Sequence, residues 1–276
     1  MATTSPGGLF PRQELDSIRA LFPHIQSGQI YLNHASISPL STRAVDAMTK
    51  YLQTHSNGTL VSYDDELKIE SDCRTAVQAL IHAESTDRIA LTGNTSDALN
   101  IVASGLPWQR GDRIILNDME FPANVYPYHH LQEQGVAVDI IKCPDGRISP
   151  EMIERTITPN TRVVALSAVQ FLSGFRADLA RIGGLCRERK VWFIVDGIQA
   201  VGAVRVDVQR MKIDGLAAGA QKWQMSVQGT GFLYVNEALQ EAIHPKYVGW
   251  LGVQDAWNFY NYGQPLAPTA KRYEGG

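Results

Sequence analysis

The sequence predicts a three-layer α/β/α protein, in which a mostly parallel, seven-stranded sheet lies between two layers of helices. Seven short apolar runs recur along the chain, each followed by turn residues and most by a helical pattern. The runs are continuous stretches of Val, Ile, Leu and Ala, which are typical of strands buried on both faces. The long crossovers between the runs favour parallel pairing.

The seven strands are expected where the apolar runs lie. Their ranges are 88–92, 113–117, 136–142, 162–168, 191–196, 216–218 and 231–235. The helix expected over 178–190 is an example of a crossover, since Asp178 can cap its start and basic residues lie in its last turn. Cys186 lies on its apolar face and is expected in the core.

Two long helices and a shorter one are expected before the first strand. Residues 13–22 have helical spacing, 30–32 form a short extended piece, and a helix covers about 65–82. Ser41 is expected to cap a further helix. We expect one face of that helix to pack on a core through an apolar stripe of Val45, Met48, Tyr51 and Leu52.

Length and composition exclude several classes of protein. A chain of 276 residues allows one or two domains, and 44% apolar with 19% charged residues argues against disorder and coiled coil. A net charge of −3 does not indicate nucleic-acid binding. Three scattered cysteines predict neither a disulfide framework nor a metal site. Without a signal peptide over residues 1–8 or a membrane-length apolar run, we expect a soluble, cytoplasmic protein.

Ligands in open α/β sheets bind beyond the carboxyl ends of the strands, so the residues that follow the runs are the candidates for chemistry. Thr95 and Ser96 open a helix after one strand, where free N–H groups and hydroxyls can hold a phosphate, although a plain N-cap is the commoner role. Phe121 lies at another strand-to-helix turn, where it either stacks on a flat ligand or fills the core.

An acid and a lysine follow two further strands. Asp196 ends an apolar run, where a carboxylate requires a cationic partner or strong donors unless it simply caps the next helix. Lys222 follows a strand of small residues; most lysines are solvated, but burial would lower its pKa and make the neutral amine a nucleophile towards a carbonyl. A phosphate cradle, an acid, a lysine and an aromatic ring together match the needs of pyridoxal phosphate.

The order and spacing of these motifs resemble the class V aminotransferase group of fold type I pyridoxal-phosphate enzymes, which also holds cysteine desulfurases and epimerase-like proteins. The resemblance extends over nearly the whole chain, and its most specific part is Asp196-x-x-Gln199 followed by Lys222. It implies that Lys222 forms the imine with the cofactor and moves the substrate α-proton. It also implies that Asp196 binds the pyridine nitrogen and Gln199 the ring hydroxyl.

The same resemblance assigns the remaining candidates. Thr95 and Ser96 match the phosphate-binding helix start, Phe121 the stacking group, and Asn33 and His34 lie near the substrate. Where many members have histidine before the lysine and serine two places before that histidine, this chain has Gln221 and Gly219. Gln170 is a candidate substitute for a substrate-contacting asparagine. These last residues define the expected cofactor and substrate contacts.

The chain ends with Lys271-Arg272-Tyr273-Glu274-Gly275-Gly276, which resembles a stretch that in the family precedes a small carboxyl-terminal domain. We therefore expect an amino-terminal segment over 1–30, a cofactor-binding large domain over 31–262 and a connector over 263–276, with the small domain absent. The family also implies a homodimer.

The leading function hypothesis is a pyridoxal-phosphate enzyme that acts on an amino acid, transaminase-like. A cysteine desulfurase, an epimerase or lyase, and a cofactor-binding module without activity are the alternatives. A dinucleotide-dependent dehydrogenase is disfavoured because no GxGxxG follows the first strand. Metal-dependent hydrolysis is disfavoured because His129 and His130 are adjacent and cannot share a helix face.

Overall fold

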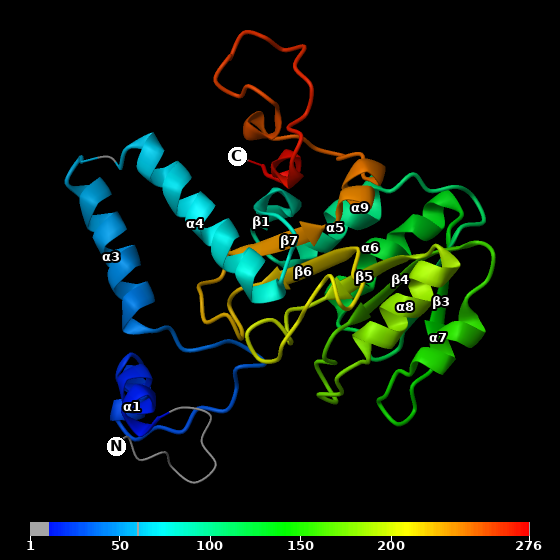
Figure 1. The fold of residues 1–276 in the computed structure, drawn as a ribbon, viewed down its shortest axis with the longest axis horizontal. Coiled ribbons are helices and arrows are strands. Elements are labelled where there is room, and N and C mark those ends of the chain that lie inside the picture. Colours follow the sequence, from blue (N-terminus) through cyan, green and yellow to red (C-terminus); the bar gives the residue numbers. More distant parts are fainter. Residues whose placement is uncertain (1–10, 60, 276) are drawn as a thin grey trace.

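A single seven-stranded sheet forms the centre of the computed structural model, which describes residues 11–59 and 61–275 (Figure 1). The expectations for residues 1–8 lie outside the described residues. The strand order is β1-β7-β6-β5-β4-β2-β3. Strand β7 is antiparallel to both of its neighbours, and every other pair is parallel, which confirms the predicted mostly parallel sheet. The strands are β1 (Ile89–Thr92), β2 (Arg113–Asn117), β3 (Ala137–Ile141), β4 (Thr161–Ser167), β5 (Trp192–Asp196), β6 (Gly215–Gly219) and β7 (Gly231–Val235).

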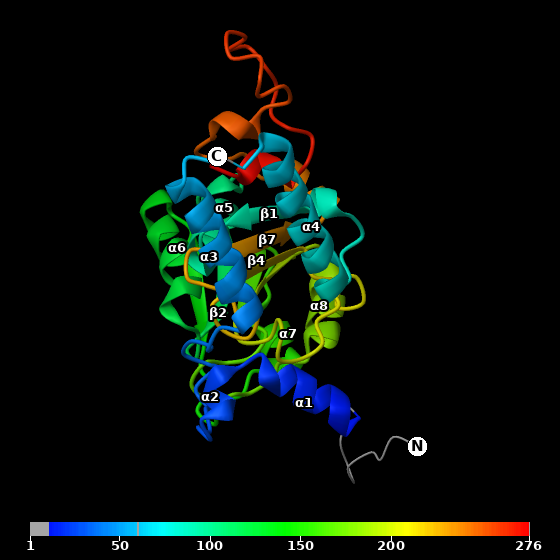
Figure 2. The ribbon, with the colours of Figure 1, turned by 90° about the vertical axis from the view of Figure 1, so that its left-hand side faces the viewer.

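Helices cover both faces of the sheet, as Figure 2 shows from its edge, so the predicted three layers are confirmed. One layer holds α4, α7 and α8, and the other holds α5, α6 and α9. The α-helices are α1 (Arg12–Ala20), α2 (Pro23–Gln26), α3 (Thr42–Ser56), α4 (Tyr63–Ile81), α5 (Thr95–Gly105), α6 (Tyr126–His129), α7 (Pro150–Thr156), α8 (Leu179–Arg189) and α9 (Glu237–Ala242).

The strands are apolar throughout because successive side chains enter different cores. In β5, Phe193 and Val195 pack with the layer of α4, α7 and α8, whereas Ile194 packs with the layer of α5 and α9. All three side chains are fully buried. The continuous apolar run thus follows from the alternation of side chains in a doubly covered strand.

The predicted helix caps are present. Ser41 Oγ accepts a hydrogen bond from the N–H of Ala44 at the start of α3 (3.3 Å), and Asp178 Oδ1 accepts one from the N–H of Arg181 at the start of α8 (3.2 Å). Cys186 is 1% exposed, which confirms its predicted place in the core.

The predicted packing of the α3 stripe on a core is wrong. No residue of α3 is buried, and Val45, Tyr51 and Leu52 are 44%, 42% and 65% exposed. Figure 1 shows α3 standing apart from the sheet, and α4 follows it in the chain. An amphipathic pattern indicates that one face avoids water, but it does not specify which surface covers that face.

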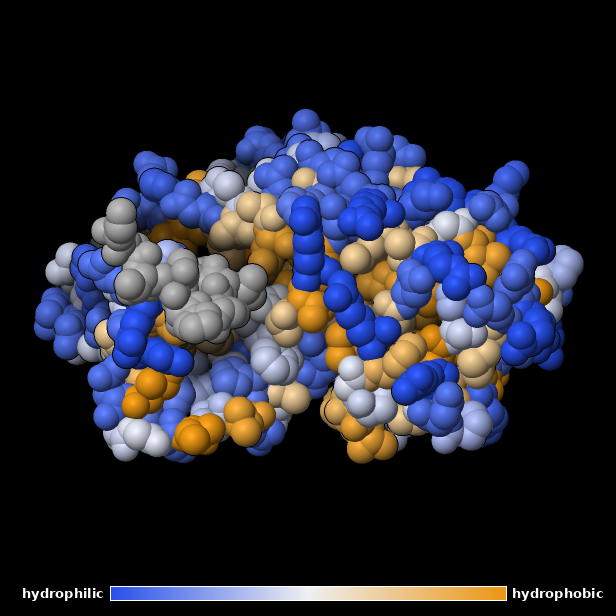
Figure 3. Space-filling model, turned by 60° about the horizontal axis from the view of Figure 1, so that its bottom comes forward, coloured by the Kyte–Doolittle hydropathy of each residue, from blue (hydrophilic) through white to orange (hydrophobic). Residues whose placement is uncertain are grey.

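Hydrophobic side chains also reach the surface elsewhere in the amino-terminal segment. Ile30 and Leu32, expected in an extended piece, lie outside every strand and are 84% and 87% exposed. Figure 3 shows hydrophobic residues open on the face seen from the bottom of Figure 1. Within the described ranges, no helix combines the length and apolarity that crossing a membrane requires.

The carboxyl-terminal residues pack against the edge of the sheet. Both carboxylate oxygens of Glu274 accept hydrogen bonds from Arg74 Nη2 of α4 (2.7 and 2.6 Å), and Oε1 also accepts one from the N–H of Leu91 in β1 (2.8 Å). The side chains of Arg74 and Glu274 are only 13% and 10% exposed. Glu274 therefore connects the end of the chain, α4 and an edge strand through one mostly buried ion pair.

Replacing Glu274 by Ala should lower the free energy of unfolding by about 2–4 kcal/mol, because it leaves the Arg74 guanidinium mostly buried and removes the acceptor of the Leu91 N–H. The matched control is Asp72→Ala, which breaks an exposed pair with Lys68 and should change stability by less than about 0.5 kcal/mol. Urea unfolding of the three proteins measures both effects. Equal losses in the two variants would contradict this interpretation of the ion pair.

Candidate active site

A cavity of about 550 Å³ lies beyond the carboxyl ends of the central strands. It brings together eight of the ten residues that the sequence singles out, and those eight come from loops far apart in the chain. They are Asn33, Thr95, Ser96, Phe121, Asp196, Gln199, Gln221 and Lys222. His34 and Gln170 do not line it.

Asp196 is the last residue of β5 and is 1% exposed. Its Oδ1 accepts a hydrogen bond from the N–H of Ile198 (3.0 Å), whereas its Oδ2 is buried without a hydrogen-bond partner in the described part of the chain. Burial raises the pKa of this carboxyl to about 7; the Ile198 hydrogen bond and Lys222 oppose the rise, and the charge of Glu120 adds to it. The site thus presents a buried carboxyl oxygen without a donor.

Lys222 lies in the loop after β6, and its side chain is half-buried. Its Nζ is 5.6 Å from the centroid of the Phe121 ring. Burial lowers the pKa of the amine, and the opposite charge of Asp196 partly offsets this. A lowered pKa increases the neutral fraction of the amine, which is the form that attacks carbonyl groups.

Backbone contacts hold the loop that carries Lys222. The N–H of Ala220 donates to Thr230 O (2.9 Å), and the N–H of Ser38, in the loop before α3, donates to Gln221 O (2.9 Å). Gly202 lies against this loop with φ +95°, and a Cβ there would be 2.4 Å from Trp223 O. A residue with a side chain at position 202 would displace the loop, so the approach requires glycine.

The start of α5 lies where the sequence predicts an anion-binding cradle, and it lines the cavity through Thr95 and Ser96. Asn94 caps the helix by accepting from the N–H of Asp97 (2.9 Å), and the first N–H groups, those of Thr95 and Ser96, have no partner inside a helix. The hydroxyl of Thr95 accepts a hydrogen bond from the N–H of Gly219 (2.8 Å) and so fixes α5 to the end of β6. This second role of Thr95 is not visible in the sequence.

The side chain of Gln221 lies against Gly219 beside the start of α5. A Cβ on Gly219 would be 2.5 Å from Gln221 Oε1 and 3.2 Å from Thr95 Oγ1. The glycine therefore leaves room for the Gln221 side chain next to the helix start.

Gln199 connects the loop before α3 to the loop over residues 220–230 that carries Lys222, called the lysine loop below. Its Nε2 donates to Ala35 O (2.8 Å), and its Oε1 accepts from Trp223 Nε1 (2.8 Å). The ring of His34 stacks on Trp223 with centroids 5.3 Å apart and 18° between the planes. His34 thus packs on the neighbour of Lys222 outside the cavity lining, and Trp223 is a site residue that the sequence reasoning missed.

Gln170 lies beneath the cavity and is 1% exposed. Its Nε2 donates to Glu120 Oε1 (2.7 Å), and its Oε1 is buried without a partner among the residues that the structure describes. Glu120 is a second site residue that sequence reasoning missed. The signal that could have found it is an acid at a strand end between Asn117 and Asn124, which both donate to it.

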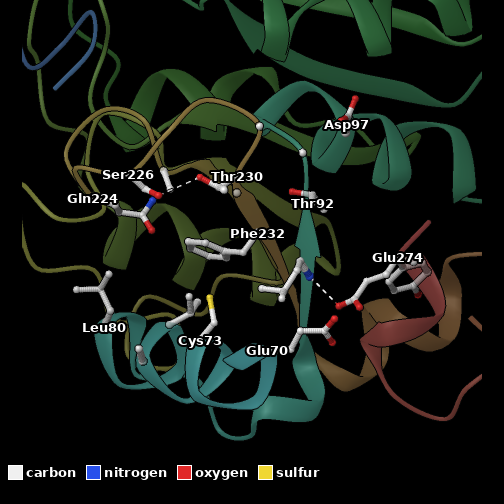
Figure 4. Close-up of a pocket in the computed structure, with 18 of the residues that line it drawn as sticks. Glu70, Cys73, Leu80, Thr92, Asp97, Gln224, Ser226, Thr230, Phe232 and Glu274 are labelled. Atoms are coloured by element: carbon white, nitrogen blue, oxygen red, sulfur yellow. Dashed lines mark hydrogen bonds between the residues drawn. The ribbon is translucent and has the colours of Figure 1, made fainter. Parts of the chain in front are cut away.

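A larger cavity of about 890 Å³ lies between α4, β1 and the loop before β7 (Figure 4). Its labelled residues include Cys73, Thr230, Phe232 and Glu274. Neither Lys222 nor Asp196 lines it, and burial raises the pKa of the Cys73 thiol, which disfavours the reactive thiolate. The candidate active site is therefore the smaller cavity.

The chain belongs to the class-V aminotransferase family, whose model matches residues 30–276. A probable cysteine desulfurase of Methanothermobacter thermautotrophicus is 32% identical over 225 residues, which are 80% of this chain and 56% of that protein. The crystal structure of the Escherichia coli cysteine desulfurase CsdA matches with a TM-score of 0.82 and 26% identity, covering 95% of this chain and 67% of that one.

A third relative bears on the cofactor. A lysine-to-alanine mutant of C-DES, with glycine covalently linked to its pyridoxal-phosphate cofactor, matches with a TM-score of 0.81 and 26% identity, covering 94% of this chain and 69% of that one. These findings confirm the predicted family, the fold class of pyridoxal-phosphate enzymes of fold type I and the cofactor class. The chain spans 56% of the length of the archaeal relative.

The residues of the smaller cavity fit pyridoxal phosphate. The unpartnered Oδ2 of Asp196 is an acceptor that a protonated pyridine nitrogen would satisfy. The start of α5 offers N–H groups for a phosphate, and Lys222 offers an amine with a lowered pKa. Each requirement of the group is met by a different strand end around one cavity.

Without cofactor, the raised pKa of Asp196 should make the protein less stable as pH rises. The folded state holds a proton up to about pH 7, whereas an unfolded Asp releases it near 3.9, so the free energy of unfolding falls between these values by roughly 1.4 kcal/mol per pH unit. Asp196→Asn should lose this contribution to the fall, whereas the exposed control Asp145→Asn should keep it. Urea titrations from pH 4.5 to 8 measure it, and equal pH dependence in wild type and Asp196→Asn would contradict the assignment.

Proposed function

We propose that this protein is a pyridoxal-phosphate enzyme that acts on an amino acid, with Lys222 as its catalytic amine and transamination as the reaction type. One observation carries the proposal: a half-buried lysine and a buried carboxylate with an unpartnered oxygen line the same cavity. A structural lysine would be expected to pair with that carboxylate or to reach solvent. The family assignment supports the same function.

Each residue of the cavity has a separate task in this proposal. The bound cofactor would supply an aldehyde and an electron-accepting ring. Lys222 Nζ supplies the amine that holds the aldehyde, and it then takes and returns the proton of the substrate α-carbon. Asp196 Oδ2 holds the proton of the ring nitrogen, and Phe121 covers one side of the cavity.

The remaining residues bind and orient. Thr95, Ser96 and Gln221 hold the phosphate at the start of α5, largely through backbone N–H groups and a neutral amide. Gln199 orients the ring hydroxyl with the hydrogen atom of its amide that Ala35 does not use. Asn33, from the rim of the cavity, contacts the substrate, while His34 and Gln170 support neighbouring residues from behind.

Cysteine desulfuration is the second candidate, because similar proteins bear that name. This reaction requires a thiolate near the substrate. None of Cys73, Cys143 and Cys186 lines the smaller cavity, and burial raises the pKa of Cys143 to about 11 and of Cys186 to about 12. The three thiols of this chain therefore favour transamination, and a desulfurase would need a thiol from outside the described cavity.

We further propose that the protein is a cytoplasmic homodimer with residues 31–262 as its cofactor-binding domain. The exposed stripe of α3 and the exposed Trp250, Trp257 and Tyr260 are apolar surface of the kind that subunits cover. No membrane or nucleic-acid partner is proposed. Light scattering at several concentrations tests the dimer.

Borohydride reduction after incubation with pyridoxal phosphate should attach the cofactor to Lys222. Peptide mapping by mass spectrometry locates the modified amine. Lys222→Ala should lose at least about 90% of the label, because Lys222 is the lysine that lines the candidate cavity, whereas the exposed control Lys142→Ala should keep it. A label distributed over surface lysines in both variants would contradict the proposal.

The reaction type is then decided from products. With an amino acid and a 2-oxo acid, transamination gives a new 2-oxo acid, whereas a desulfurase supplied with cysteine and a reductant gives sulfide and alanine. A labelled Lys222 together with no spectral response to any amino acid would identify a cofactor-binding module without activity.

A further inference from the structure

A second buried carboxylate, that of Glu120, lies beneath the candidate active site. It is 7% exposed and stands between β2 and the short 3-10 helix η2 (Pro122–Asn124). Its Oε1 accepts from Asn117 Nδ2 (2.5 Å) and Gln170 Nε2 (2.7 Å), and its Oε2 accepts from Asn124 Nδ2 (2.9 Å) and Ser167 Oγ (2.6 Å). The N–H of Ser167 donates to both oxygens (2.9 and 3.0 Å).

These donors favour one protonation state of the Glu120 carboxyl. An ionised carboxylate only accepts hydrogen bonds, and amide N–H groups point at both oxygens of Glu120, which is the pattern that favours the ionised form. Every donor is neutral, and none of the ion pairs formed within residues 11–59 and 61–275 includes Glu120. Hydrogen bonds stabilise the charge, but no cation in contact cancels its field, so the field acts on other buried groups nearby.

The hydrogen bonds of Glu120 connect it to Asp196 through the end of β4. Ser167, which donates to Glu120 through both its N–H and its hydroxyl, is the direct partner of Asp196 in the parallel pair of β4 and β5. The next residue, Ala168, donates its N–H to Asp196 O (2.9 Å). Glu120 therefore fixes the strand end against which Asp196 is held.

Three ionisable side chains face Asp196 from the surrounding elements: Glu120 from the end of β2, Lys222 from the loop after β6, and Tyr128 from α6. Tyr128 is fully buried and its hydroxyl has no partner, and burial raises its pKa, so it stays neutral. Glu120 is thus the one negative charge among these neighbours, and it raises the pKa of Asp196.

We infer that Glu120 is a positioning residue that acts through Asp196: it holds the end of β4 beside Asp196, and its uncancelled charge strengthens the hold of the Asp196 carboxylate on a proton. In the cofactor-bound protein, the charge of Glu120 would favour protonation of the pyridine ring nitrogen. Only this statement about the cofactor rests on the proposed function. A carboxylate in contact with neither cofactor nor substrate would then contribute to the electron-accepting power of the site.

The test is the titration of Asp196 in the protein without cofactor, followed by NMR of 13C-labelled aspartate carboxyls, with the signal assigned from Asp196→Asn. In Glu120→Gln the midpoint of Asp196 should fall by roughly one pH unit. In the exposed control Glu154→Gln it should stay within about 0.2 units, as expected for a charge screened by solvent. An unchanged midpoint in folded Glu120→Gln would overturn the inference.

Loosening of the site could also lower that midpoint by admitting water, and Ser167→Ala separates the two causes. This variant removes one hydrogen bond to Glu120 but keeps its charge, so the midpoint should stay near that of the wild type. A fall as large as in Glu120→Gln would show that the charge is not responsible and would overturn the inference.

If Glu120→Gln does not fold, the titration of Asp196 is repeated in Glu120→Asp, which keeps the charge. The midpoint of Asp196 should then stay near that of the wild type, and a fall of roughly one pH unit would overturn the inference. None of these titrations involves pyridoxal phosphate, so a failure here leaves the borohydride result for Lys222 standing, and the reverse also holds.

Discussion

A carboxylate buried with one oxygen unpartnered is the constraint on which this site depends. Asp196 ends a strand whose neighbours on both sides are also strands, so the fold itself removes the carboxylate from water. Such burial is unfavourable for an anion unless a donor or cation arrives. The described residues supply one donor, to Oδ1, and leave Oδ2 as an acceptor that a protonated ligand atom would satisfy.

Hydrogen bonds join the lysine loop to the loop before α3 beside this carboxylate. Gln199 holds Ala35 and Trp223 at once, and Ser38 bonds to the carbonyl of Gln221. Because these contacts flank Lys222 on both sides, its position depends on residues about 185 positions earlier in the chain. The segment that provides them belongs to the same region as the poorly covered helix α3.

The sequence predicts the sheet well because each strand is a continuous apolar run, which local composition reveals. It also predicts which residues follow the strand ends, since topology brings those ends to one edge. It predicts less about contacts that depend on tertiary structure. The stripe of α3 indicates a protected face, but its partner is not encoded in the helix. The two hydrogen bonds of Gln199, the bond of Thr95 to Gly219 and the four contacts of Glu120 with Ser167 and Gln170 all join residues that no spacing rule connects.

The protonation of the bound cofactor tests the central claim most directly. We expect 15N NMR of the protein loaded with 15N-labelled pyridoxal phosphate to show a protonated ring nitrogen through neutral pH, and expect Asp196→Asn to bind the cofactor with that nitrogen unprotonated. A ring nitrogen that is unprotonated in the wild type, or equally protonated in both proteins, would contradict the account.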